Sequence, residues 1–236
     1  MITDEDRKAV ISKIHEIEVT VVSRDGRSVP IRELGQAAAH VSAKLASSSD
    51  ALMPVLRTAL VINWREAAMK PRYDRFRAEF PEVSTLASLK KVLDEVEPLE
   101  FCNKYLNINA NSIENPKYRL LLELTNGFLG YQQAFELVSE IEAIRHWAAR
   151  VDTKNLDNDP IGRIHGVGIA VVENIRLNLG LPVVKPDRHV IGVMEKFLRV
   201  NIPRDSYGDF AESIGMDKRY FDAITFEYGK EKDISG

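Results

Sequence analysis

Two glycines that flank one apolar residue form the most informative short motif in the chain. Gly166 and Gly168 stand on either side of Val167, and this spacing permits a tight turn whose backbone N–H groups point outward. The helical pattern of residues 169–179 follows directly, and Gly180 would close that helix. A turn that leads into a helix N-terminus can bind an anion, because orphan N–H groups and the helix dipole both favour negative charge. The motif therefore predicts a phosphate contact, although the same spacing also suits a plain helix–helix turn.

A carboxylate stands shortly after this motif. Asp187 directly precedes another amphipathic pattern, residues 190–200, where short polar side chains commonly cap a helix. A carboxylate near an anion-binding turn has a second use, because it can stabilise a developing positive charge and can orient or deprotonate a water molecule. The residues alone leave both interpretations of Asp187 open.

The order and spacing of these motifs resemble the signature of the helix-hairpin-helix DNA glycosylase superfamily. The matching features are the Gly-Val-Gly turn, a helix of about three turns, a Gly-Leu-Pro turn, an apolar pair, and Asp187 with His189 two residues later. The resemblance is close over residues 159–198 and looser over residues 52–150. It implies that the hairpin binds the backbone of a DNA strand. It also implies that Asp187 is the catalytic carboxylate, which stabilises the deoxyribose cation as a damaged or modified base departs.

Departures from the family pattern indicate whether the expected enzyme only excises a base or also cuts the DNA backbone. Members that also cut the DNA backbone carry a lysine just after the hairpin, which forms a Schiff base with the sugar. Here those positions hold Ile169 and Ala170. Lys185 is an alternative amine, but a surface or phosphate-contacting lysine is the plainer interpretation. The single cysteine, Cys102, excludes a four-cysteine iron–sulfur cluster held by this chain alone. The resemblance thus predicts a monofunctional glycosylase that needs no cofactor and leaves an abasic site.

Further residues near the motif are expected to contact DNA or a cation. The family resemblance suggests that backbone carbonyls of the turn, from Ile164 to Val167, hold a monovalent cation such as Na⁺ or K⁺. Basic side chains near the motif would contact phosphates and would make binding to double-stranded DNA depend on salt. Besides Gly166, Val167 and Gly168 of the turn, the expected DNA contacts are Arg163, His165, Arg176, Lys185, Arg188 and His189.

An enzyme that cleaves a glycosidic bond in duplex DNA must flip the target nucleotide out of the stack. It therefore needs a side chain that fills the gap and a pocket for the base. The family resemblance points to the first long core helix for the gap-filling side chain, here Asn63 or Trp64, and we include Tyr131 among the candidates for the pocket. Trp64 equally suits a core position, and aromatic residues at helical spacing usually belong to the core.

Helical periodicity dominates the rest of the chain and predicts an all-α protein. Residues 19–31 are the exception, because β-branched runs surround Asp25-Gly26 and predict a small β-hairpin. Pro71 should end one helix, and a later helix should end near Gly127 or Gly130. We expect a two-lobed glycosylase-like helical fold. It would consist of an N-terminal segment (1–50), a helical lobe (51–150) and a region with the hairpin and Asp187 (151–236), with an active-site cleft between the lobes.

Composition argues partly against a nucleic-acid binder, since the 236 residues carry a net charge of −3. The chain has no apolar run of the length of a membrane helix and no signal-peptide pattern, so we expect a cytoplasmic monomer. Two alternatives stay open: a non-catalytic helix-hairpin-helix module that binds DNA, and an all-α protein-interaction domain. The excised base, and the choice between DNA repair and defence against modified phage DNA, are not determined by the sequence.

Overall fold

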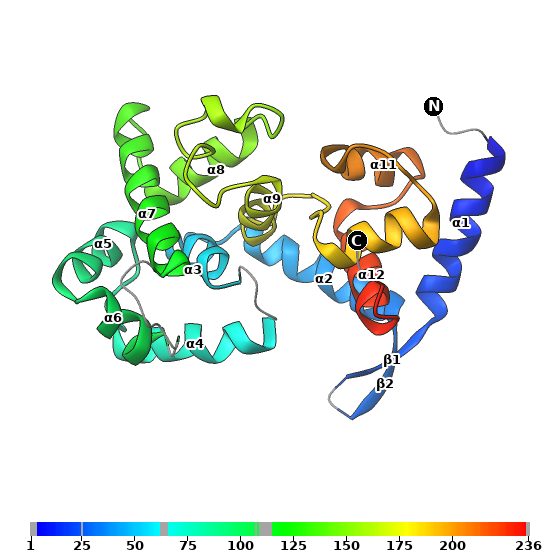
Figure 1. The fold of residues 1–236 in the computed structure, drawn as a ribbon, viewed down its shortest axis with the longest axis horizontal. Coiled ribbons are helices and arrows are strands. Elements are labelled where there is room, and N and C mark those ends of the chain that lie inside the picture. The colour runs from blue at the N-terminus through cyan, green and yellow to red at the C-terminus, as the bar shows by residue number, and fades with distance from the viewer. Residues whose placement is uncertain (1–3, 25, 62–65, 107, 109–114, 235–236) are drawn as a thin grey trace. The chain divides into compact units, whose positions relative to one another are not determined.

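The computed structural model describes residues 4–24, 26–61, 66–106, 108 and 115–234, and these residues are mostly helical (Figure 1). One antiparallel pair of short strands is the exception. The expectation of an all-α protein with a small β-hairpin is therefore confirmed. In the part of the chain that the structure describes, no helix is both long and apolar enough to cross a membrane.

The chain divides into two compact units, each with its own set of helices. Unit 1 contains residues 1–47 and 180–236, and unit 2 contains residues 48–179. The boundary expected near residue 50 lies close to the first division, whereas the boundary expected near residue 150 lies well before the second division, between residues 179 and 180. Residues 151–179 belong with the preceding helices, because α9 (Ile169–Asn178) packs on α3 (Leu52–Val61) and α8 (Glu140–Arg150).

Unit 1 joins the two ends of the chain around one core. Helix α2 packs on α12, α12 packs on α10, and α1 packs on both α2 and α12. The elements of unit 1 are α1 (Asp4–Val19), β1 (Val21–Arg24), β2 (Arg27–Pro30), α2 (Ile31–Ala46), α10 (Arg188–Gly192), the π-helical turn η3 (Val193–Leu198), η4 (Arg204–Ser206), α11 (Tyr207–Ser213) and α12 (Lys218–Glu231).

The strands β1 and β2 form the predicted hairpin between α1 and α2 (Figure 1). Val21 pairs with Pro30 and Arg24 pairs with Arg27, so the connection has two residues. Gly26 in that connection has a φ of +76°, which suits the hairpin turn signalled by the sequence.

Close approach between helices in unit 1 depends on two glycines. A Cβ at Gly35 of α2 would lie 2.6 Å from Ile224 of α12, and a Cβ at Gly229 of α12 would lie 2.7 Å from the carbonyl oxygen of His189. Any larger residue at these positions would push the helices apart. Gly229 thus sets how closely α12 approaches the first turn of α10, the turn that Asp187 precedes.

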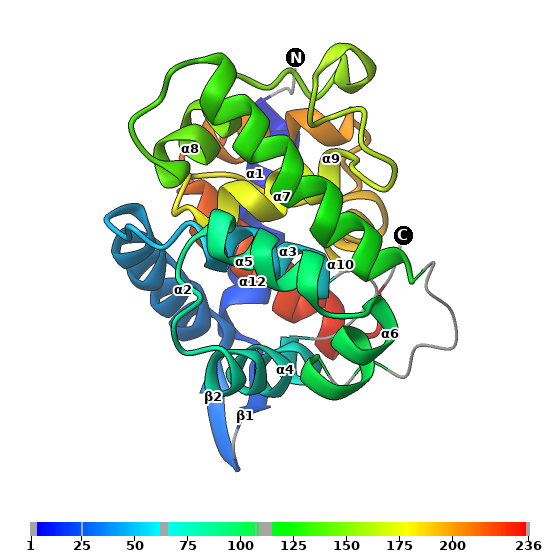
Figure 2. The ribbon, with the colours of Figure 1, turned by 90° about the vertical axis from the view of Figure 1, so that its left-hand side faces the viewer.

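Unit 2 is a set of helices around α7, with α5 and α7 side by side in Figure 2. Its core includes Phe76, Phe101, Phe128 and Trp147, all fully buried. The elements of unit 2 are α3 (Leu52–Val61), α4 (Glu66–Glu79), α5 (Leu86–Glu95), α6 (Pro98–Glu100), the π-helical turn η1 (Phe101–Tyr105), α7 (Pro116–Ala134), α8 (Glu140–Arg150), η2 (Leu156–Asn158) and α9 (Ile169–Asn178).

Two expected helix ends in unit 2 are wrong. Helix α4 continues through Pro71, because the next turns bury Phe76 against Phe80 and Phe101, and this packing outweighs the loss of one backbone hydrogen bond. Helix α7 continues through Gly127 and beyond to Ala134. Gly127 serves close packing rather than termination, since a Cβ there would lie 3.3 Å from the side chain of Ile164.

Candidate functional site

The segment between Asp159 and the glycine hairpin is a single helical turn. The carbonyl of Asp159 accepts a hydrogen bond from the amide of Arg163 (3.0 Å), and residues 160–166 form turns and a bend and no α-helix. The carboxylate of Asp159 accepts from the amides of Ile161 (2.9 Å) and Gly162 (2.6 Å) and from Nε1 of the buried Trp147 (2.8 Å). The core of unit 2 therefore fixes this turn through one carboxylate oxygen.

The hairpin itself is tight and exposed. The amide of Val167 donates to the carbonyl of Ile164 at 2.9 Å, and Gly166 has a φ of +91°, a conformation that favours glycine. Gly166 and Gly168 are exposed, and a Cβ at either position would meet no atom within 4 Å. Arg163 and His165 are exposed as well. A large ligand can therefore reach the backbone of the hairpin.

Helix α9 begins directly after the hairpin with an uncapped N-terminus. Gly168 is the N-cap residue and provides no side-chain oxygen. Among the described residues, the amides of Gly168, Ile169 and Ala170 have no hydrogen-bond acceptor. These amides and the dipole of a ten-residue helix favour an anion at this position.

Buried polar contacts hold α9 in place within unit 2. The Asn174 side chain on α9 donates to Thr58 Oγ1 on α3 at 2.9 Å, and both residues are buried. Arg176, which we expected to contact phosphate, instead binds within unit 2. Its guanidinium donates to the carbonyls of Ala148 (2.8 Å) and Val151 (3.0 Å) at the end of α8 and to Glu173 (2.7 Å). At least three of its five N–H donors therefore have acceptors within unit 2, which argues against the expected phosphate contact of Arg176.

Asp187 is the N-cap residue of α10 in unit 1. Its Oδ1 accepts hydrogen bonds from the amides of His189 (2.9 Å) and Val190 (3.0 Å). Its Oδ2 has no hydrogen-bond partner in the described part of the chain, and the residue is half-buried. The cap thus fixes the orientation of the carboxylate while one oxygen remains available for a ligand or a water molecule.

The other predicted residues near Asp187 lie in the same unit. Arg188 is exposed, and its Nε lies 3.3 Å from Nε2 of His189. Nδ1 of His189 lies 3.3 Å from the carbonyl of Ile234, and its ring packs edge-on against Phe226. Both ring nitrogens of His189 therefore have partners within unit 1. Lys185 is half-buried in the extended segment before α10.

The predicted base-pocket residue Tyr131 and the predicted cation ligand Ile164 both lie in unit 2. Tyr131 lies on α7, is 8% exposed, stacks on Phe135, and places its hydroxyl 2.9 Å from Nδ1 of His146. The carbonyl of Ile164, a predicted cation ligand, accepts the turn hydrogen bond from Val167. Asn63 and Trp64 lie outside the described residues.

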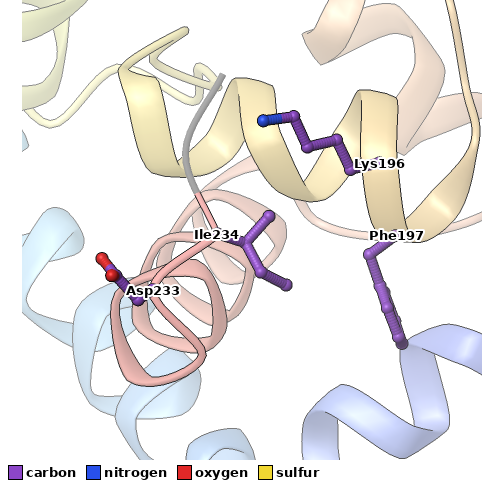
Figure 3. A pocket seen from close by; sticks show the side chains of 4 residues that line it. All are labelled: Lys196, Phe197, Asp233 and Ile234. Carbon is purple, nitrogen blue, oxygen red and sulfur yellow. The ribbon is translucent and has the colours of Figure 1, made fainter.

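A shallow hollow in unit 1 is lined by Lys196, Phe197, Asp233 and Ile234 (Figure 3). In Figure 3 the Ile234 side chain points toward the helix that carries Lys196, whereas the Asp233 carboxylate points away from it. Asp187 does not line this hollow. We therefore assign no base-binding role to it.

Comparison of the chain with protein-family models, with curated proteins and with solved structures found no match.

Two groups with perturbed acidity were missed by the sequence analysis. Burial, together with the nearby charge of Asp187, raises the pKa of Asp222 on α12 to about 7. Burial, together with Arg72, lowers the pKa of the Lys117 amine on α7 to about 8, and its Nζ donates to the carbonyl of Leu60 at 3.0 Å. No sequence signal marks either residue, because both shifts arise from contacts between segments distant in sequence.

Proposed function

We propose that the protein is a monofunctional DNA glycosylase that hydrolyses the N-glycosidic bond of a damaged or modified base flipped out of double-stranded DNA. The observation that carries the proposal is the geometry of Asp187, whose Oδ1 is held by two backbone amides while Oδ2 has no hydrogen-bond partner among the described residues. A fixed carboxylate with one available oxygen is suited to stabilising positive charge on a substrate.

The proposed DNA anchor is the hairpin with the N-terminus of α9. The amides of Gly168, Ile169 and Ala170, which have no acceptor among the described residues, would bind one phosphate of the strand without reading its sequence. Arg163 and Arg188, both exposed, would add phosphate contacts. A monovalent cation held by carbonyls of the turn would add positive charge near the same phosphate.

In the proposed reaction the bond between C1′ of the deoxyribose and the base nitrogen breaks, and its electron pair leaves with the base. The Asp187 carboxylate stabilises the cation that develops on the sugar. A water molecule then adds to C1′ and gives up one proton, and the departing base gains one. The products are a free base and an abasic site.

Water is the proposed nucleophile because no amine follows the hairpin. Ile169 and Ala170 occupy the positions where bifunctional members of the resembling family place a lysine. Borohydride should therefore trap no covalent complex between the protein and its DNA substrate. If a complex is trapped, the monofunctional assignment is wrong, and Lys117 is the first amine to replace, because its lowered pKa leaves part of it neutral near pH 8.

The cap geometry also supports a second candidate, a non-catalytic module that binds DNA. Asp187 makes the two backbone hydrogen bonds of an ordinary N-cap, so a purely structural role would account for its position.

The net charge of −3 favours the third candidate, an all-α protein-interaction domain. Salt-dependent binding to duplex DNA would argue against that third candidate.

The test is incubation of the protein with duplexes that carry alkylated, oxidised, deaminated, mismatched or hypermodified bases, followed by alkali. The expected result is strand breakage on at least one duplex that requires both alkali and an intact Asp187. Asp187→Asn keeps the cap and removes the charge, so it should bind that duplex without cleaving its glycosidic bond. Binding without breakage by the unaltered protein on every duplex would favour the non-catalytic module.

A further inference from the structure

The segment that carries Asp187 is held by a second carboxylate. Residues 181–187 form no helix or strand. The amide of Asp187 donates to the carbonyl of Lys185 at 2.8 Å, a tight turn centred on Pro186. The amide of Lys185 in turn donates to Oδ1 of Asp222 on α12 at 2.6 Å. Two consecutive hydrogen bonds therefore connect Asp222 to the backbone of Asp187.

The ionised form of Asp222 lowers the stability of the folded protein. It is half-buried, and burial is the main cause that raises its pKa to about 7, while the charge of Asp187 raises it further. The Lys185 amide hydrogen bond and the charges of Lys185 and Arg219 act in the opposite direction. An asparagine would accept the same hydrogen bond without this electrostatic cost. The ionised side chain destabilises the folded protein, and such groups are often retained for function.

The charged groups that act on Asp222 come from two elements. Asp187 and Lys185 lie on the extended segment, and Arg219 lies on α12 itself. Other charged and titratable groups around α12 act on different residues. Glu16 acts on Tyr228, Glu18 and Arg32 act on Tyr220, Arg24 contacts Glu227, Asp209 and Glu212 contact Lys218, and His189 contacts Phe226. Asp187 is therefore the negative group whose charge raises the pKa of Asp222.

We propose that Asp222 is a positioning residue for Asp187, which holds its segment through the Lys185 amide and adds a second negative charge to the field that stabilises the sugar cation. This inference rests on the proposed function of Asp187. It makes base excision depend on pH near neutrality. Below about pH 7 the protonated Asp222 still holds the segment but supplies no charge, and above about pH 7 its carboxylate is ionised.

The test is the single-turnover rate of base release between pH 5.5 and 8.5. In the unaltered protein the rate should rise about fivefold through pH 7, the effect of one charge at moderate distance. Asp222→Asn keeps the hydrogen bond and should lack this rise, with a rate near that of the unaltered protein at low pH. Asp222→Leu loses the hydrogen bond and should be slower at every pH. Asp217→Asn, at the exposed N-cap of the same helix, should keep the original profile.

An unchanged pH profile in Asp222→Asn would overturn the inference while leaving the proposed function of Asp187 intact. A second measurement needs no DNA. Carboxyl carbon NMR should place the titration of Asp222 near pH 7, and Asp187→Asn should lower its pKa because a neighbouring negative charge is removed. If the unaltered protein releases no base from any duplex, the proposed function fails, and an Asp222 titration that does not respond to Asp187→Asn overturns the coupling independently.

Discussion

Helices α9 and α10 begin in opposite ways. Helix α9 starts at Gly168, where no side chain caps the first amides and the backbone is open to solvent. Helix α10 starts at Asp187, whose Oδ1 satisfies the amides of His189 and Val190. The N-terminus of α9 is suited to accept an external anion, whereas that of α10 is already neutralised by its own carboxylate. The comparison separates the two tasks that we propose: α9 binds the DNA backbone, and the α10 cap supplies the charge for chemistry.

The largest expected effect comes from removing the charge of the α10 cap. Asp187→Asn should lower the single-turnover rate of base release by a factor of about 10²–10⁴. The free energy of unfolding should change little, because asparagine caps a helix nearly as well. Asp187→Ala should lose the same activity and, in addition, about 1 kcal/mol of stability in a denaturant titration. Asp217→Asn is the matched control, and a similar loss of activity there would indicate a general effect of altered caps.

The second largest effect is the pH dependence of the free energy of unfolding that Asp222 causes. The unfolded chain releases this proton near pH 3.8, whereas the folded protein keeps it until about pH 7. Between these values the folded state binds more protons, so the ionisation of Asp222 lowers stability as pH rises. Asp222→Asn should therefore be more stable than the unaltered protein at pH 8, by roughly 1–3 kcal/mol after allowance for screening, and close to it at pH 4. Urea titrations at the two pH values measure the difference, and an equal difference at both would contradict the assigned ionisation.

The third prediction concerns a substitution that gives α9 a carboxylate cap like that of α10. Gly168→Asp places a carboxylate where phosphate is proposed to bind, and space for a Cβ is available. DNA affinity should fall about tenfold at low salt, while stability stays equal or rises by a few tenths of a kcal/mol. Gly168→Ser caps without charge and should lose less affinity in the same binding titration. Unchanged affinity in Gly168→Asp would remove the hairpin from the DNA interface.

The smallest effect is expected for single arginines. Arg163→Ala and Arg188→Ala should each weaken DNA binding a few-fold at low salt and reduce the slope of log affinity against log salt by about one. Arg27→Ala, exposed on strand β2, is the control and should leave the slope unchanged. Salt titrations of fluorescence anisotropy with a short duplex would measure both quantities, and equal slopes for all three variants would show that the two arginines do not contact phosphate.

Local features of the fold were predictable because a few neighbouring residues determine them. Asp25-Gly26 indicated the β-hairpin, Gly180 ends α9 with a φ of +79°, and Asp187 begins α10. Glycines within helices could not be interpreted in the same way. The role of Gly127 depends on Ile164, which approaches it only in the folded unit, so the sequence suggested a helix end where the structure has a packing contact.

The candidate site shows the same limit. The positions of the Gly166–Gly168 turn and of the Asp187 cap follow from local sequence, and the structure confirms both. Proximity in sequence suggested a phosphate contact for Arg176, whereas the folded unit brings its guanidinium to the carbonyls that end α8. Asp222 was missed because its link to Lys185 joins α12 to a distant segment.

The central claim, that binding and chemistry are separated between the two helix N-termini, is tested by measuring DNA binding and single-turnover base release on one cleavable duplex for Asp187→Asn and Gly168→Asp. Asp187→Asn should bind with unaltered affinity and release almost no base. Gly168→Asp should bind more weakly but release base at the unaltered rate once the protein saturates the DNA. Base release by Asp187→Asn at the unaltered rate would contradict the account, because Asp187 would then be only a helix cap.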